Sequence, residues 1–142
     1  MKRLIAIGLT WLACIPAWTA ENAKAGAVDA VAALHAEVIT PASNVLFQAE
    51  STPPSTAQEW QKIRASAADL QRAAVQLTTK DLAKDQGQWL EFAQALQKQA
   101  HQAVIAAEKK DQDALVTANG DVISVCEDCH TKYRDAGRSM KQ

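Results

Sequence analysis

Apolar residues recur at helical spacing in four successive stretches of this chain, and this periodicity limits the folds that it can adopt. An apolar residue at every third or fourth position gives each helix one apolar face, which has to be buried against a neighbouring helix. The stretches are 26–50, 56–78, 88–110 and 111–137. None shows the strict alternation of a strand. We therefore predict an all-α fold, an antiparallel up-and-down four-helix bundle with short connections.

Particular residues mark where these helices begin, bend and end. Pro41 lacks an amide donor and disfavours helix at the preceding residue, so we predict a kink or a short break near Thr40. Thr56-Ala57-Gln58-Glu59 has the pattern of a capping box, which predicts that a helix begins there. The charged segment 79–87 lacks a long apolar stripe, and we predict that it is a loop.

The N-terminus has the residue order of a secretory signal. Lys2 and Arg3 precede an apolar run over 4–17, which is too short to span a bilayer. We predict removal of residues 1–25, because they end in an A-x-A pattern, and cleavage after Ala20 is the alternative. A retained membrane anchor formed by the same apolar run is the other interpretation. Export would place the protein in the periplasm, without stable membrane insertion once the signal is removed.

Cleavage after residue 25 would leave 117 residues, which is one ordinary domain with a single core. The signal carries three basic residues and one acidic residue, so 12 basic and 15 acidic side chains remain, with a net charge of −3. The basic residues are scattered among acidic ones rather than gathered in a stripe. This charge pattern does not suggest a nucleic-acid partner.

The last helical stretch contains Cys126-Glu127-Asp128-Cys129-His130, which has the Cys-x-x-Cys-His pattern that attaches c-type haem. On a helix, positions 126, 129 and 130 project from one face, so one flat cofactor can meet all three side chains. We predict thioether bonds from Cys126 and Cys129 to the haem, with His130 as the proximal ligand of the iron. Cys14 leaves with the signal, so both remaining thiols belong to the motif.

Other chemistries use the same residue types. A thioredoxin-like pair needs a βαβ setting with its first thiol at a helix N-terminus, whereas this pair lies within a helical pattern. A structural zinc site needs four ligands, and the other histidines, His35 and His101, lie far from the motif in sequence. A disulfide between Cys126 and Cys129 would close a very short loop and stabilise little. We therefore favour haem, with the other interpretations left open.

With the motif on the last of four helices, and with Tyr133 and Arg134 completing C-x-x-C-H-x-x-Y-R, the chain resembles the class II cytochromes c, the cytochrome c prime family. In architecture the resemblance covers 26–142, which we predict to be one four-helix-bundle cytochrome domain. It implies one covalent haem per chain, bound through the motif, and a contact between Arg134 and a haem propionate. Tyr133 is expected to pack along the haem-bearing face.

Members of this family place the distal side of the iron against the first helix, where a methionine gives a low-spin electron carrier. This chain has only Met1, in the signal, and Met140, which is badly placed to reach the distal face. The distal candidates are therefore Leu34, His35 and Val38. An apolar residue there would leave the iron five-coordinate, whereas His35 would ligate it. The heptad stripe that would turn His35 inward consists of Val28, Val31, His35, Val38, Ala42 and Val45.

These expectations lead to two functions. The first is a periplasmic monohaem protein that exchanges single electrons with redox partner proteins. The alternative is a five-coordinate haem module that binds small gases such as nitric oxide or carbon monoxide. An enzyme such as a peroxidase is disfavoured, because only His35 could supply the distal acid/base group. Family members often form dimers through their first two helices, so the resemblance allows a homodimer.

Overall fold

The computed structural model describes residue 26 and residues 30–135 of the chain. Every regular element among these residues is helical, so the predicted all-α class is confirmed. The elements are η1 (His35–Ile39), α2 (Thr40–Ser51), α3 (Ala57–Leu77), α4 (Gln88–Lys109), α5 (Gln112–His130) and η2 (Thr131–Asp135). The predicted signal and Met140 lie outside the described residues.

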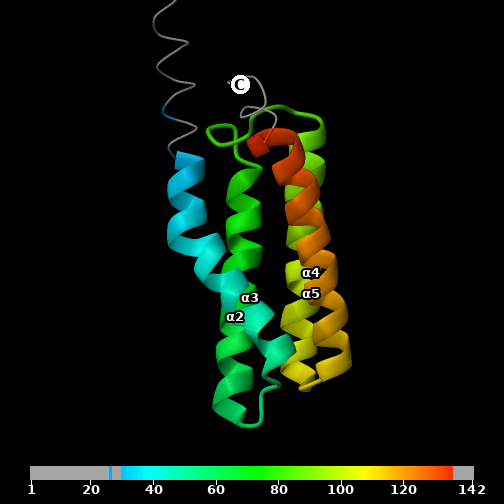
Figure 1. Cartoon of the computed structure of the whole chain (residues 1–142). Coiled ribbons are helices and arrows are strands. Elements are labelled where there is room, and N and C mark those ends of the chain that lie inside the picture. Colours follow the sequence, from blue (N-terminus) through cyan, green and yellow to red (C-terminus); the bar gives the residue numbers. More distant parts are fainter. Residues whose placement is uncertain (1–25, 27–29, 136–142) are drawn as a thin grey trace, which may run out of the picture.

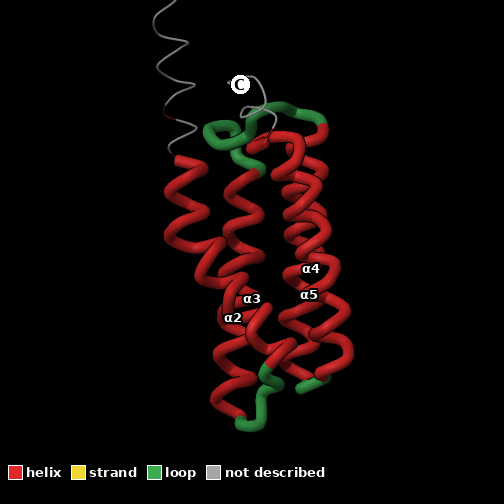
Figure 2. Tube along the Cα trace, viewed as in Figure 1, coloured by secondary structure: helices red, strands yellow, loops and turns green. Residues whose placement is uncertain are grey.

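The long helices lie side by side, and successive helices run in opposite directions (Figure 1). Helix α3 packs against α4 and α4 packs against α5, while α2 contacts both α3 and α5. The loop between α3 and α4 covers residues 78–87, which agrees with the loop predicted there (Figure 2). This loop lies at the same end of the molecule as the C-terminal end of α5 and the beginning of the first helix (Figure 1).

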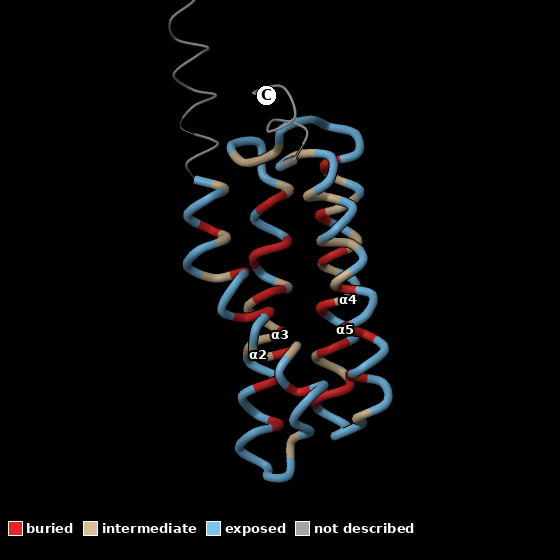
Figure 3. Tube along the Cα trace, in the orientation of Figure 1, coloured by how far each residue is buried: buried red, intermediate tan, exposed pale blue. Residues whose placement is uncertain are grey.

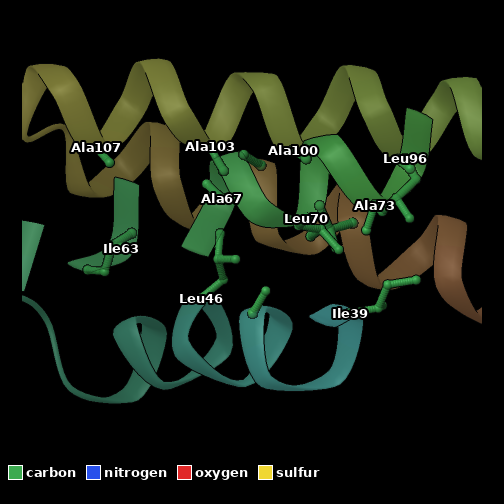
Figure 4. Close-up of a cluster of buried hydrophobic side chains, with 14 of the residues drawn as sticks. Ile39, Leu46, Ile63, Ala67, Leu70, Ala73, Leu96, Ala100, Ala103 and Ala107 are labelled. Carbon is green, nitrogen blue, oxygen red and sulfur yellow. The ribbon is translucent and has the colours of Figure 1, made fainter. Parts of the chain in front are cut away.

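The core is a continuous strip of buried side chains along the inner faces of the helices (Figure 3). Ala67 on α3 and Ala100 and Ala103 on α4 are fully buried where these two helices face each other (Figure 4). Because alanine is small, the two helices can approach closely along this strip. The largest fully buried apolar side chains are Leu46, Leu70, Leu115 and Val122.

The predicted kink in the first helix takes the form of a π-helical turn. Residues 30–34 are α-helical and lead directly into η1, where the Thr40 amide donates to the His35 carbonyl five residues earlier. Pro41 follows in the first turn of α2. The axis of the helix bends at this point (Figure 1). A π turn next to a proline is a common cause of such a bend.

The π turn also shifts which residues of the first helix face the core. The buried residues are Leu34, Ile39, Ala42, Leu46 and Ala49, so the spacing is five residues across η1 and three or four afterwards. The predicted heptad stripe assumed uninterrupted helical spacing. Ala42 of that stripe is buried, whereas its valines at 31, 38 and 45 are only half-buried, at the edge of the core.

By length and composition alone, the helix Ala30–Ser51 is suited to crossing a membrane. In this structure it packs within the helical assembly. The side chain of Leu46 is fully buried, and its carbonyl accepts a hydrogen bond from Asn119 of α5 (Nδ2–O 2.7 Å). Gln112 of α5 donates to the Ala49 carbonyl in the same way (Nε2–O 2.9 Å).

The capping box at the start of α3 is confirmed. The Thr56 hydroxyl accepts from the Glu59 amide at 3.2 Å, and the Glu59 carboxylate accepts from the Thr56 amide at 2.8 Å. The Ser55 amide also donates to Glu59, at 2.7 Å. These backbone amides, Ser55 first, together with the two hydroxyls, lower the pKa of Glu59 from 4.5 to about 2.

Substitution of Glu59 by glutamine is expected to flatten the acid dependence of stability. Because the carboxylate has a lower pKa in the folded chain, its stabilising effect is full above about pH 4.5 and disappears as the pH falls toward about 2. Urea unfolding followed by circular dichroism at a series of pH values measures this slope. The exposed Glu50 on α2 provides the control substitution, E50Q, which should keep the wild-type slope. Equal slopes for wild type and E59Q would contradict the prediction.

Candidate functional site

The three residues of the predicted attachment motif lie together at the C-terminal end of α5. Cys126, Cys129 and His130 are half-buried, and all three line one small cavity between the helices. The spacing of three and four residues places them on one helix face, as predicted. Both cysteines are free thiols, so the structure contains no disulfide between them.

The surroundings of both thiols raise their pKa values. Burial, followed by the charges of Cys129 and Glu127, raises the pKa of Cys126 to about 11. Burial also raises the pKa of Cys129, although Lys84 opposes this shift. A redox-active Cys-x-x-Cys pair needs a thiolate with a lowered pKa, usually at a helix N-terminus. This pair has neither feature, so the thioredoxin-like interpretation gains no support.

The small cavity has a volume of about 50 Å³ and an almost entirely apolar lining. Helices α3 and α4 contribute Leu77, Trp89 and Leu96 to it, and η1 contributes His35 and Ile39. Figure 4 shows Ile39 and Leu96 at one end of the buried cluster, so the cavity continues the core toward the motif. Its complete lining is His35, Ile39, Leu77, Trp89, Phe92, Ala93, Leu96, Val125, Cys126, Cys129 and His130. We call this space the inner cavity.

A larger and more open cavity of about 460 Å³ adjoins the inner one, and we call it the outer cavity. The two share His35, Trp89, Cys129 and His130. The lining of the outer cavity also includes two cationic side chains, Lys84 and Arg134. The remaining residues of its lining are Val31, Thr40 and Tyr133. The combined site is therefore apolar inside and positively charged toward its opening.

His35 and His130 face each other in this site. Their ring centres are 5.7 Å apart, and the ring planes are tilted by 43°. The His35 Nδ1 atom lies 2.9 Å from the Val31 carbonyl oxygen. Of the three distal candidates, His35 is thus the one that lies opposite His130.

The other two distal candidates are placed differently. Leu34 is buried in the core and Val38 is half-buried, and neither belongs to the lining of the two cavities. Ile39 belongs to the inner cavity and was not among the candidates. The only signal for it in the sequence is Pro41, since a π turn before the proline moves Ile39 to the inward-facing position.

Tyr133 packs against two aromatic residues of α4, close to the C-terminal end of α5. Its ring makes edge contacts with Trp89 and Phe92, with ring centres 5.0 and 6.3 Å apart. Its hydroxyl donates to Asp85 in the loop after α3. Burial and this carboxylate raise the pKa of Tyr133 to about 12, and the same hydrogen bond lowers that of Asp85. This hydrogen bond connects the loop to η2, the turn that follows α5.

Lys84 lies in the same loop and also approaches this cluster. Its Nζ is 5.5 Å from the centre of the Trp89 ring and 5.9 Å from that of Tyr133. Sequence reasoning did not select Lys84, because nothing in a charged loop distinguishes one lysine from another. Arg134 Nη1 lies 3.3 Å from His130 Nδ1, one helical turn away. His101 is exposed on α4 and belongs to the lining of neither cavity.

Within the part of the chain that the structure describes, no group of three or more His, Cys, Asp and Glu side chains is arranged to hold a metal ion on its own. Comparisons of the chain with family models, with curated proteins and with solved structures returned no match.

Proposed function

We propose that this chain is a monohaem c-type cytochrome with the up-and-down four-helix-bundle architecture of the class II type, which carries single electrons in the periplasm. The observation that carries the proposal is the position of Cys126, Cys129 and His130, which line one apolar cavity at the end of the helices. Two thiols would hold the haem covalently and one imidazole would ligate its iron.

The residues of the site fit this cofactor. A haem has an apolar macrocycle and two anionic propionates. The inner cavity of about 50 Å³ is too small for the macrocycle by itself, but the adjoining outer cavity of about 460 Å³ also has a mostly apolar lining and offers the room. Lys84 and Arg134 at the outer cavity suit the propionates. Because haem brings four nitrogen ligands of its own, one or two protein ligands suffice. The absence of a larger ligand cluster among the described residues is therefore compatible with the proposal.

Arg134 would change its partner when the cofactor is present. A guanidinium only donates hydrogen bonds, so in the observed contact the His130 Nδ1 atom accepts. An imidazole that binds iron through Nε2 carries its proton on Nδ1 and no longer accepts there. We therefore expect Arg134 to exchange this contact for a propionate, as the resemblance to class II cytochromes implies.

Electron exchange would need both the haem and the surrounding protein. The bound haem supplies a redox centre that takes up and releases one electron. The C-terminal end of α5 would hold Cys126, Cys129 and His130 in place, and the apolar lining of the inner cavity would exclude water. The open outer cavity would leave one side of the site accessible to a redox partner protein. Ligand identity and burial then tune the potential.

Expression of the full chain in a bacterium that contains the haem c maturation machinery tests the proposal. The wild-type protein should retain haem after denaturation, and its intact mass should exceed that of the polypeptide by one haem. The double variant C126A/C129A should lose this covalent haem. Cys14→Ser is the matched control, because that thiol lies in the predicted signal.

The same mass spectrum reports the N-terminus. A mature chain that begins at Gly26 would agree with the preferred cleavage site, and one that begins at Glu21 would agree with the alternative. Wild-type protein without covalent haem, obtained from cells that load a known cytochrome c, would contradict the proposed function.

A further inference from the structure

Two imidazoles from distant parts of the chain meet at the site. His35 begins η1 near the N-terminal end of the first helix, and His130 is the last residue of α5. Both rings line both cavities, so they lie at the boundary between the apolar interior and the charged opening. A haem attached to Cys126 and Cys129 has to lie in this space, with His130 on one side of it.

The hydrogen bond of His35 determines which ring nitrogen is available to a ligand. The Val31 carbonyl oxygen can only accept, so the Nδ1 atom, 2.9 Å away, carries the proton in this contact. The neutral ring then has its lone pair on Nε2. Histidines that ligate metals usually donate their other ring nitrogen to a carbonyl or carboxylate in this way, because the bond fixes both tautomer and orientation.

The backbone around His35 has a geometry that serves this orientation. The π turn η1 inserts one residue between Leu34 and the next buried position, Ile39. His35 at the beginning of this turn and Ile39 at its end both line the inner cavity. π turns within helices occur often at functional sites, because the extra residue redirects a side chain at a cost in helix stability.

The separation of the two rings suits a single metal between them. An imidazole nitrogen binds a metal such as zinc at about 2 Å, so two imidazoles on opposite sides of one metal ion have ring centres about 6 Å apart. The observed separation is 5.7 Å. The adjustment needed is small compared with the range of a side-chain rotation at a half-buried position.

We infer that His35 is the second axial ligand of the haem iron, so that His35 and His130 hold it as a six-coordinate pair of imidazoles. The inference rests on the proposed function and deepens it. With both axial positions filled by the protein, the site is closed to nitric oxide and carbon monoxide and is suited to electron transfer. The gas-binding alternative would need His35 to stay away from the iron.

Optical and electron paramagnetic resonance spectra of the haem-loaded full chain test the inference. The ferric wild-type protein should be low-spin, and its ferrous spectrum should not change when carbon monoxide is added. His35→Ala should become high-spin and bind carbon monoxide, and added imidazole should restore the low-spin spectrum. His35→Met should remain low-spin with an altered spectrum, because a thioether replaces the imidazole as ligand.

His101→Ala is the matched control, since it removes an exposed histidine from α4 and should leave both spectra unchanged. Far-UV circular dichroism of each variant shows that its helices are intact. A high-spin wild type, or a His35→Ala variant that remains low-spin without added imidazole, would overturn the inference. Because both outcomes require covalent haem in the wild-type protein, they are distinct from the failure of the proposed function, in which no haem is attached at all.

Discussion

Replacement of Trp89 by alanine is expected to lower the free energy of unfolding by about 3–5 kcal/mol, the range for the loss of a large buried aromatic side chain. Only 4% of Trp89 is exposed. Its ring packs against Tyr133 with centres 5.0 Å apart, and its Nε1 donates to the Leu77 carbonyl at 2.7 Å. Leu77 is the last residue of α3, so the variant also removes the partner of a carbonyl at a helix end.

Because Trp89 lines both cavities, W89A should disturb the site as well as the fold. Urea unfolding measures the loss of stability, and the haem spectrum of the loaded protein reports the site. Trp60→Ala is the matched control, since Trp60 is also buried, near the beginning of α3, but belongs to neither cavity. It should lose comparable stability with an unchanged spectrum. A loss below about 1 kcal/mol for W89A, less than a core Trp→Ala change costs, would show that the residue does not anchor this end of the fold.

Replacement of Asn119 by aspartate is expected to destabilise the protein by about 3–5 kcal/mol at pH 7, as for other buried charges without a partner. Asn119 on α5 is fully buried, and its Nδ2 donates to the Leu46 carbonyl at 2.7 Å. Its Oδ1 atom is buried without a hydrogen-bond partner among the described residues. An ionised aspartate cannot donate, so two acceptors would face each other inside the core.

The destabilisation by N119D should become smaller at acidic pH, because a protonated carboxyl group can again donate to the Leu46 carbonyl. Asn119→Leu is the matched control. It removes both polar atoms at nearly the same volume, and the Leu46 carbonyl keeps its helical partner within α2, so the change should cost little. Urea unfolding of both variants at pH 7 and pH 4 measures these differences. Equal losses for the two variants at pH 7 would contradict the prediction.

Local patterns in the sequence were sufficient to locate the helices of this protein. Helical periodicity, the Thr56–Glu59 capping box and the charged loop over 79–87 all act within a few residues along the chain, and the structure confirms each of them. The bend at Pro41 was predicted for the same reason. The π turn itself was not predicted, because a proline is compatible with several backbone conformations, and packing against the other helices selects one of them.

The same distinction applies to the candidate site. The spacing within the motif places Cys126, Cys129 and His130 on one face of the helix, since this depends only on helix geometry. The sequence left two possibilities for the side opposite His130: Leu34 or Val38 covering a five-coordinate iron, or ligation of the iron by His35. The structure places His35 opposite His130. It adds Ile39, which the π turn η1 brings to a buried position, and Lys84, which the loop between α3 and α4 brings to the outer cavity.

The sequence by itself therefore determined the helical class, the helix ends and the shared helix face of Cys126, Cys129 and His130, all of which depend on residues close together in the chain. Only the tertiary structure decided that His35 faces His130 across an apolar cavity with a cationic opening. That arrangement depends on how the first helix packs against the end of α5. Packing between segments far apart in sequence has no signature in the local periodicity of either one.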